Sequence, residues 1–165
     1  MNYHEIRNND MLNGEGLRVV LFLSGCDHKC KGCHNPQTWD YCSGMLFDEA
    51  AKQELFDKLS QEHIDGITFS GGDPFSEHNI QETTVLIHDI KERFPNKTVW
   101  VYTGNTFEHI KENYYYALCN VDVLVDGKFV QELADVNYPW AGSTNQRVID
   151  VQKTLGQEEI ILFEV

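Results

Sequence analysis

Three cysteines, Cys26, Cys30 and Cys33, lie close together in the segment 24–39. Their C-x3-C-x2-C spacing places three thiolates in one short loop, where they can converge on a single iron–sulfur cluster. Such a loop supplies one ligand fewer than a four-iron cluster usually takes from protein. An iron without a protein ligand can bind a substrate, as the open position of a catalytic zinc does. The spacing therefore predicts a metal site with one open coordination position.

A structural zinc site is the main alternative for this loop. The three cysteines together with His28 or His34 would form the Cys3His ligand set that tetrahedral zinc accepts. A disulfide framework is disfavoured, because Cys42 and Cys119 bring the cysteine total to five, an odd number. We expect these two cysteines to be free and buried as small apolar side chains. Other segments of the chain are needed to distinguish an iron–sulfur site from a zinc site.

Length and charge indicate one acidic domain. The chain has 165 residues and a formal net charge of -13, so we expect a single domain spanning residues 1–165 and no nucleic-acid partner, since binding nucleic acid requires a basic face. No signal peptide and no membrane-spanning apolar stretch is visible, so we expect a cytoplasmic protein without membrane contact. In that reducing compartment, clustered cysteines favour metal binding or catalysis over disulfides.

Apolar runs alternate with amphipathic segments along the chain. The predicted strands are 17–23, 66–70, 98–102 and 121–125, and the predicted helices are 48–60, 76–94 and 106–118. Around them we expect an edge or irregular segment at 1–16, a helical turn at 130–133 and late strands at 147–151 and 159–163. Asp48 and Thr106 suit the helix starts. The alternation predicts an α/β fold with parallel strands joined by right-handed crossovers.

Four chemically unusual segments each follow a predicted strand. They are 26–33, 71–74, 102–105 and 126–128. Because the active sites of parallel sheets lie at the carboxyl ends of the strands, we expect these segments to meet. A structural zinc site does not need the other three segments, so the pattern favours a catalytic site.

Side chains in two of these segments indicate a ligand that carries both charges. Gly71 and Gly72 let the backbone approach a ligand closely, and Asp73 can accept a hydrogen bond from an ammonium group. Asp126 and Lys128 stand two apart, so an extended segment would point both side chains to the same side. Asp126 could then meet a hydroxyl or amine of a ligand, and Lys128 a carboxylate. The alternative is a pair of turns, with Asp73 capping a helix. S-adenosylmethionine, placed over an open iron, would use all of these groups.

The combined pattern resembles the radical S-adenosylmethionine enzymes, through the cysteine motif after the first strand and Gly-Gly-Asp-Pro after the second. Segments 13–18, 22–26, 33–35 and 38–39 are similar to the glycyl-radical activating enzymes, and 101–104, 122–128 and 142–147 resemble the branch that activates anaerobic (class III) ribonucleotide reductase. The resemblance implies a single-domain partial (β/α) barrel with a mostly parallel curved sheet. This would be the radical S-adenosylmethionine core in short form, with its cluster loop at 24–39.

The resemblance also implies a mechanism. Cys26, Cys30 and Cys33 would hold one [4Fe-4S] cluster per chain, with S-adenosyl-L-methionine on the fourth iron and no catalytic residue beyond these ligands. One electron from a donor such as flavodoxin or a thioredoxin-type reductant would cleave the sulfonium. The resulting 5'-deoxyadenosyl radical would take hydrogen from a glycine of the large glycyl-radical subunit of the reductase.

The same resemblance assigns ligand contacts to further residues. Gly32, Cys33 and His34 would lie along the nucleoside, Gly72 and Asp73 at the methionine amino group, and Asp126 with Lys128 farther along. Two positions depart from the wider pattern: Gly32 stands where an aromatic residue is frequent, and Asp73 where the longer Glu is common. Segment 142–147 is a candidate contact with the partner.

Three alternatives stay open from the sequence. One is a pyruvate formate-lyase type activase, whose Cys-His-Asn and Thr-Trp pattern fits about equally well, although the chain is short for it. A second is a deazaguanine synthase, which shares the Gly-Glu-Gly segment but not the residues after Cys33. The third is a non-catalytic zinc or iron–sulfur binding module.

Overall fold

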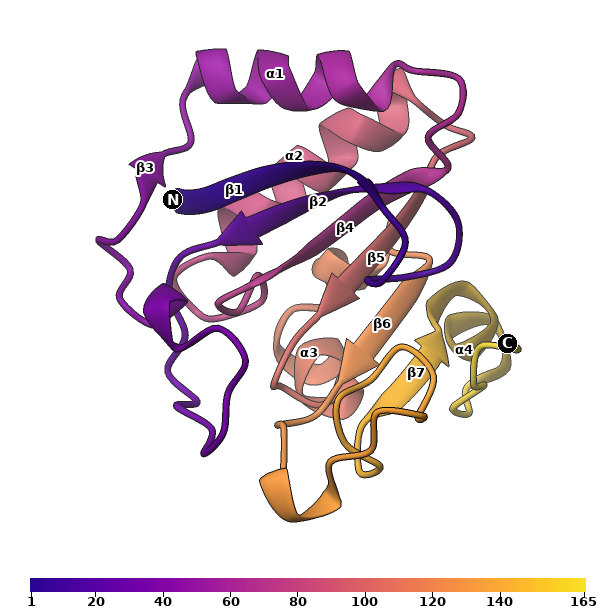
Figure 1. The fold of residues 1–165 in the computed structure, drawn as a ribbon. Helices are drawn as coiled ribbons and strands as arrows, with labels where there is room; N and C mark the ends of the chain where they lie inside the picture. The colour runs from indigo at the N-terminus through magenta and orange to yellow at the C-terminus, as the bar shows by residue number, and fades with distance from the viewer.

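Seven strands form one mixed sheet in the computed structural model, which describes residues 1–165 (Figure 1). They are β1 (Asn2–Asp10), β2 (Arg18–Leu23), β3 (Met45–Leu46), β4 (Gly66–Gly71), β5 (Thr98–Tyr102), β6 (Val123–Asp126) and β7 (Arg147–Asp150). The order across the sheet is β3-β1-β2-β4-β5-β6-β7. The central strands β2, β4, β5 and β6 are parallel, and β1, β3 and β7 are antiparallel to their neighbours. The predicted α/β fold with a parallel centre is confirmed.

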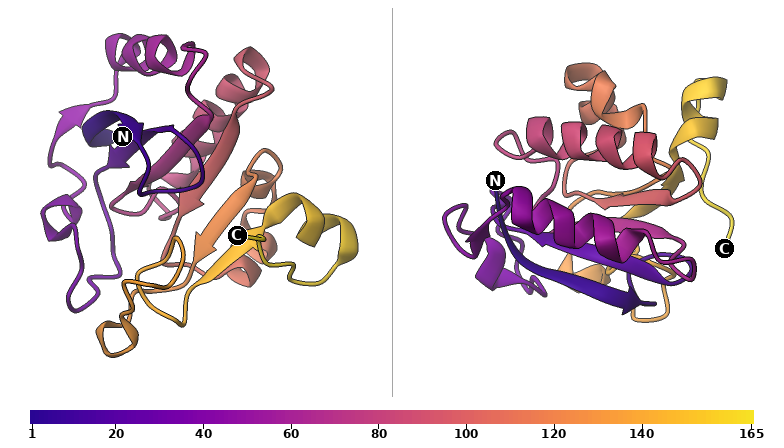
Figure 2. Two further views of the ribbon diagram at one scale, coloured as in Figure 1. Left: turned by 45° about the vertical axis from the view of Figure 1, so that its right-hand side comes forward. Right: turned by 90° about the horizontal axis from the view of Figure 1, so that it is seen from above.

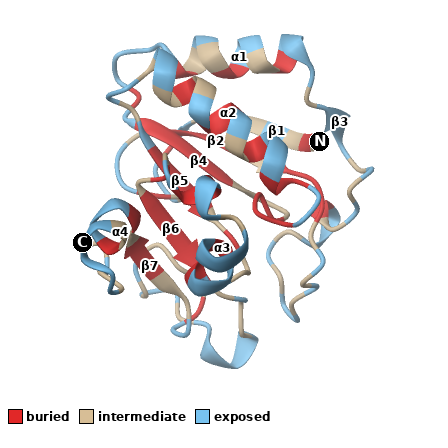
Figure 3. Ribbon diagram, turned by 180° about the vertical axis from the view of Figure 1, so that it is seen from behind, coloured by how far each residue is buried: buried red, intermediate tan, exposed pale blue.

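The longer helices cover one face of this sheet (Figures 2 and 3). The helices are α1 (Glu49–Leu59), α2 (Ile80–Arg93), α3 (Phe107–Asn113) and α4 (Val151–Gln157), with 3-10 turns η1 (Pro36–Thr38), η2 (Tyr115–Leu118) and η3 (Gln131–Leu133). The predicted cap at Thr106 is confirmed, because its hydroxyl oxygen accepts a hydrogen bond from the His109 N–H, and the Asp48 carboxylate caps α1 by accepting one from the Ala51 N–H. No helix is both long enough and apolar enough to cross a bilayer.

The two faces of the sheet are packed differently. Residues alternate along β5, so that Val99 and Val101 point into the larger apolar core under the helices, whereas Trp100 points to the opposite face. That opposite face carries a small apolar core, against which Trp140 and Phe163 pack from the C-terminal part of the chain. Loops rather than helices therefore cover this face, which leaves room for a site.

A buried arginine fixes one of the covering loops. Arg18, only 1% exposed, donates hydrogen bonds to the hydroxyl of Thr68, to the hydroxyl and carbonyl oxygens of Thr98, and to the Glu15 carbonyl. Burial lowers the pKa of its guanidinium to about 10. Because the Thr68 hydroxyl in turn bonds to the Asn13 carbonyl, the β1–β2 loop is tied down onto the sheet.

Two predictions about the outer parts of the chain are wrong. Residues 159–163 form no strand, because beyond α4 the chain meets β7 at only one isolated bridge, Ile149 to Leu162. Cys42 and Cys119 are free but exposed rather than buried. Each lies outside the regular elements, Cys42 in a turn that the Asp40 carboxylate closes and Cys119 just after η2, so neither side chain reaches a core.

Candidate metal centre

The three clustered cysteines line one cavity of about 400 Å³ at the carboxyl ends of the parallel strands. All four strand-end segments contribute to its lining, as the parallel topology predicts. Besides the cysteines, they contribute Gly71, Gly72 and Asp73 at the end of β4, Tyr102, Thr103 and Gly104 at the end of β5, and Gly127 after β6. The expectation that these segments meet is therefore confirmed.

Backbone contacts hold the cysteine loop in place. The Gly25 N–H donates to the Thr38 carbonyl at 2.6 Å, the Cys26 N–H to the Trp39 carbonyl at 3.1 Å, and the Cys33 N–H to the Cys30 carbonyl at 3.1 Å. All three thiols are free and half-buried. Burial raises the pKa of the Cys26 thiol to about 11, so a metal that binds this sulfur must displace its proton.

Gly32 has a conformational role inside the loop. Its φ is +76°, a left-handed value that favours glycine, and a Cβ at this position would lie 2.9 Å from the side chain of Gln131. An aromatic residue would be strained here by the positive φ, which is consistent with the departure from the wider pattern. Gly32 itself does not line the cavity.

The glycine pair at the end of β4, Gly71 and Gly72, brings two backbones together. Gly71 has a φ of +97°, and a Cβ on Gly72 would lie 2.4 Å from the carbonyl oxygen of Gly25. The Gly72 N–H donates to the Leu23 carbonyl at 2.8 Å and the Asp73 N–H to the Gly25 carbonyl at 2.7 Å. The close approach that these glycines permit is thus to the start of the cysteine loop.

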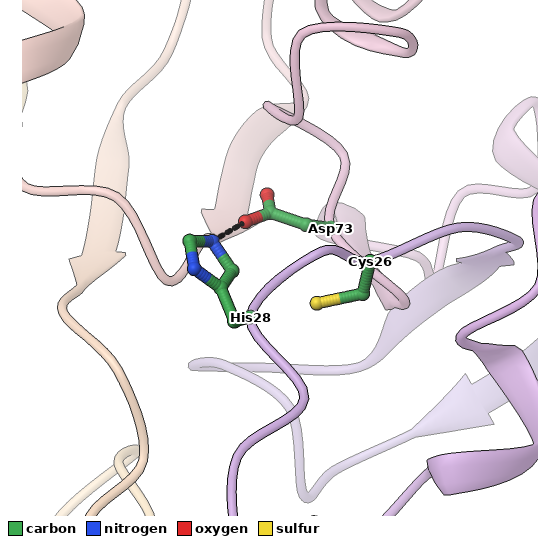
Figure 4. Close-up of side chains that lie close together, drawn as sticks. All are labelled: Cys26, His28 and Asp73. Atoms are coloured by element: carbon green, nitrogen blue, oxygen red, sulfur yellow. Dashed lines mark hydrogen bonds and ion pairs between the residues drawn. The ribbon is translucent and has the colours of Figure 1, made fainter.

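Asp73 lies in a small polar network beside the Cys26 thiol (Figure 4). Its carboxylate is 1% exposed and accepts hydrogen bonds from the Phe75 N–H at 2.9 Å and the Gly104 N–H at 3.1 Å. The Nε2 of His28 lies 2.7 Å from its Oδ2. The ligand atoms of Cys26, His28 and Asp73 all lie within 4.8 Å of one another.

The geometry argues against a Cys3His zinc site. A tetrahedral zinc ion holds its sulfur ligands about 3.8 Å apart, but Cys30 and Cys33 lie outside the compact group that contains Cys26. Thiols spread around a cavity suit the separate corners of a larger cluster.

Asp126 and Lys128 are not brought to the cavity. Asp126 is 1% exposed, and its carboxylate accepts the Phe107 N–H at 2.7 Å and two Arg147 N–H groups at 3.1 and 2.6 Å. Lys128 is exposed and does not line the cavity. The expectation of an extended segment fails because Gly127, with a φ of +96°, turns the chain between them. The geometry does not support either residue as a ligand contact.

An aromatic wall of the cavity was not predicted from the sequence. Tyr102, Phe129, Tyr138 and Trp140 are among the residues that line the cavity. The Tyr102 hydroxyl donates to the Trp140 carbonyl at 2.6 Å, which fixes the β6–β7 loop to β5, and burial raises the pKa of this tyrosine above its usual value. The available signal was the concentration of large rings in the otherwise polar, turn-forming segment 138–146.

A family comparison agrees with this geometry. Residues 12–149 match the family model described as a 4Fe-4S single cluster domain. The mixed sheet, the cysteine loop at its carboxyl edge and this match together define an α/β iron–sulfur protein with one 4Fe-4S cluster domain. The zinc alternative is thereby set aside.

Similar curated proteins give a narrower class. The chain is 45% identical over 148 residues to the anaerobic ribonucleoside-triphosphate reductase-activating protein of Enterobacteria phage T4, covering 90% of this chain and 93% of that protein. It is 40% identical to the proteins of the same name from Haemophilus influenzae (88% and 96% covered) and Escherichia coli K12 (90% and 97% covered). The chain belongs to the family of anaerobic ribonucleoside-triphosphate reductase-activating proteins.

Proposed function

We propose that this protein activates an anaerobic ribonucleoside-triphosphate reductase by reductive cleavage of S-adenosylmethionine. When bound, the [4Fe-4S] cluster supplies the electron that cleaves this sulfonium to methionine and a 5'-deoxyadenosyl radical, which takes a hydrogen atom from a glycine of the reductase. The observation that carries the proposal is the meeting of the C-x3-C-x2-C thiols with Gly72 and Asp73 in one cavity. The names of the relatives supply the partner.

The residues present suit such a cluster. Cys26, Cys30 and Cys33 are free thiols on the wall of a cavity, and each would bind one iron as the thiolate. The motif supplies three thiolates, one fewer than the number of irons in a four-iron cluster. One iron would therefore be left for the amino and carboxylate groups of the substrate.

Asp73 would receive the ammonium group of the bound substrate. Its carboxylate is held in one orientation by the Phe75 and Gly104 N–H groups and by His28, and its side chain lies on the cavity wall beside Cys26. A carboxylate held in one orientation would position the ammonium group of the ligand for the reaction. The backbone of Cys33 and His34, which also line the cavity, would lie along the nucleoside.

The fold would act as one domain over residues 1–165, a partial (β/α) barrel in which the helix-free face of the sheet holds the reacting groups. The aromatic wall would keep water from the radical, because its apolar rings form part of the cavity lining. An external one-electron donor, a flavodoxin or a thioredoxin-type reductant, would serve the site in the cytoplasm.

The test uses anaerobically reconstituted protein, dithionite and S-adenosylmethionine, with and without the large reductase subunit. We expect 5'-deoxyadenosine in the first mixture and, in the second, the doublet of a glycyl radical in electron paramagnetic resonance. A protein with a full cluster that releases no 5'-deoxyadenosine would refute the proposal. Cleavage without a glycyl radical would instead place the chain among enzymes that act on small molecules.

A further inference from the structure

Two loops far apart in the sequence present bare apolar side chains at the cavity. Leu12 on the β1–β2 loop is 81% exposed and Val136 on the β6–β7 loop is 100% exposed, yet both belong to the lining of the cavity that holds the thiols. Met11 and Leu133, on the same two loops, are 66% and 44% exposed and lie outside the lining itself. We call these four side chains the cavity lips.

The first lip is held in position by a buried carboxylate. Asp10, 5% exposed, accepts hydrogen bonds from the Leu12 N–H at 2.8 Å, from the Asn13 N–H at 2.9 Å and from the Asn13 side-chain amide at 3.1 Å. The Asn13 carbonyl is bonded to Thr68, which is bonded to Arg18. The loop is thus built to keep Leu12 out of the apolar core and at the cavity.

The second lip is the tip of a small closed hairpin. The Thr144 N–H donates to the Leu133 carbonyl at 2.9 Å and the Asp135 N–H to the Gly142 carbonyl at 3.2 Å. The Asp135 carboxylate then accepts the Asn137 N–H at 2.9 Å, which closes the turn around Val136. A valine fixed by this turn in full contact with water gains nothing for the fold, so its apolar surface is available to a partner.

We propose that the cavity lips hold a glycine-containing, extended main-chain segment of the large reductase subunit as it enters the cavity. The proposal rests on the proposed function, which requires a glycine Cα–H of another protein to reach the space beside the thiols. A small substrate would fill the interior of the cavity but would leave the exposed side chains of Leu12 and Val136 uncovered. A polypeptide passing between the two loops would bury both lips at once. Apolar contacts suit an extended segment that is recognised through its main chain rather than through charged side chains.

The first lip is free of charged side chains in a strongly acidic chain. The formal charge of the chain is -13, yet no charged residue stands between Asp10 and Glu15, whereas Glu132 and Asp135 flank Leu133 in the second lip. Other exposed apolar residues, such as Val85 on α2, line no part of this cavity. Val85 therefore offers a matched control.

Binding can be measured apart from chemistry. Reconstituted wild-type protein, Leu12→Asp plus Val136→Asp, and Val85→Asp would be immobilised and titrated with the large reductase subunit by surface plasmon resonance. We expect the double variant to weaken binding about tenfold or more, because a charge is placed at each buried contact, and Val85→Asp to match wild type. Leu12→Ala plus Val136→Ala, which adds no charge, should weaken binding by a smaller factor in the same direction.

Each outcome of this experiment decides the proposal. Unchanged affinity in both double variants would overturn it, and so would equal weakening by Val85→Asp. If wild-type protein is a dimer by sedimentation and the lip variants turn monomeric, the lips bind a second copy of the chain and the proposal is wrong. Absence of S-adenosylmethionine cleavage by wild type would refute the proposed function alone, because subunit binding is scored independently.

Discussion

The Nε2 of His28 lies 2.7 Å from Oδ2 of Asp73, so the cysteine loop after β2 is bonded by a side chain to the turn after β4. His28 stands between two of the predicted cluster ligands, and Asp73 is 1% exposed. Their contact joins the residues that would hold the metal to the residue that would orient the substrate. A displacement of one is therefore transmitted to the other.

Removing the imidazole should destabilise the protein. In His28→Ala the buried Asp73 carboxylate loses one of its hydrogen-bond partners, and we expect the free energy of unfolding to fall by about 1–3 kcal/mol. Urea denaturation of the metal-free protein measures this loss. His88→Ala, at an exposed histidine on α2, should stay within about 0.5 kcal/mol of wild type; an equal effect of both variants would contradict the role given to the contact.

The three loop cysteines should differ sharply from the other two. Cys26→Ala, Cys30→Ala and Cys33→Ala each remove a predicted ligand, so we expect loss of the brown colour and of bound iron after anaerobic reconstitution. Cys42→Ala and Cys119→Ala change exposed thiols outside the cavity and should retain both. Iron and sulfide analysis with visible absorption gives the readout. A full cluster in any of the first three would remove that residue from the ligand set.

Asp73→Asn tests the carboxylate without changing its size. We expect S-adenosylmethionine to bind at least about tenfold more weakly, because the neutral amide loses the attraction to the ligand ammonium, while the cluster is retained. Equilibrium dialysis of the reconstituted protein measures the affinity. Asp126→Asn should instead lower the stability through its contacts with Phe107 and Arg147 and leave the affinity unchanged, since that carboxylate does not face the cavity.

The strands and the position of the site could be predicted from the sequence, but the orientation of some site residues could not. The cysteine spacing and the buried runs of β2, β4 and β5 predicted the sheet and the edge at which the site lies, because parallel topology brings strand ends together whatever the loops do. Asp126 and Lys128 were misplaced because their orientation depends on one dihedral, the positive φ of Gly127. The alternation rule that placed them holds only in extended backbone.

The loops were the least predictable part for the same reason. Leu12 and Val136 have no periodic pattern, and their exposure follows from hydrogen bonds made by Asp10 and Asp135. Trp140 reaches the cavity because the Tyr102 hydroxyl holds its carbonyl from another strand. Such contacts join residues that are distant in the sequence, so they cannot be predicted from composition.

Replacing Gly72 or Gly156 by alanine should change the stability of the protein in opposite directions, because the two glycines have different surroundings. Gly72→Ala would place a Cβ 2.4 Å from the backbone oxygen of Gly25, which cannot rotate away, so the β4 turn must separate from the cysteine loop. We expect a loss of at least about 2 kcal/mol in stability and poor cluster retention. Gly156→Ala, in α4 with no atom within 4 Å, should instead stabilise the protein by about 0.5–1 kcal/mol. Thermal unfolding of both variants decides.

The buried Tyr102 hydroxyl should cause the free energy of unfolding to decrease at alkaline pH. Burial raises the pKa of its hydroxyl above the usual value of 10.0, so the unfolded chain releases this proton at a lower pH than the folded protein does. Between these two pKa values the unfolded state binds fewer protons, and the free energy of unfolding decreases as the pH rises from about 10. Tyr102→Phe should be less stable at pH 8, because the Trp140 carbonyl loses its donor, but should show a flatter decline above pH 10. Urea unfolding of both proteins at pH 8, 10 and 11 measures this, and parallel declines would mean that the Tyr102 hydroxyl titrates alike in the folded and unfolded states.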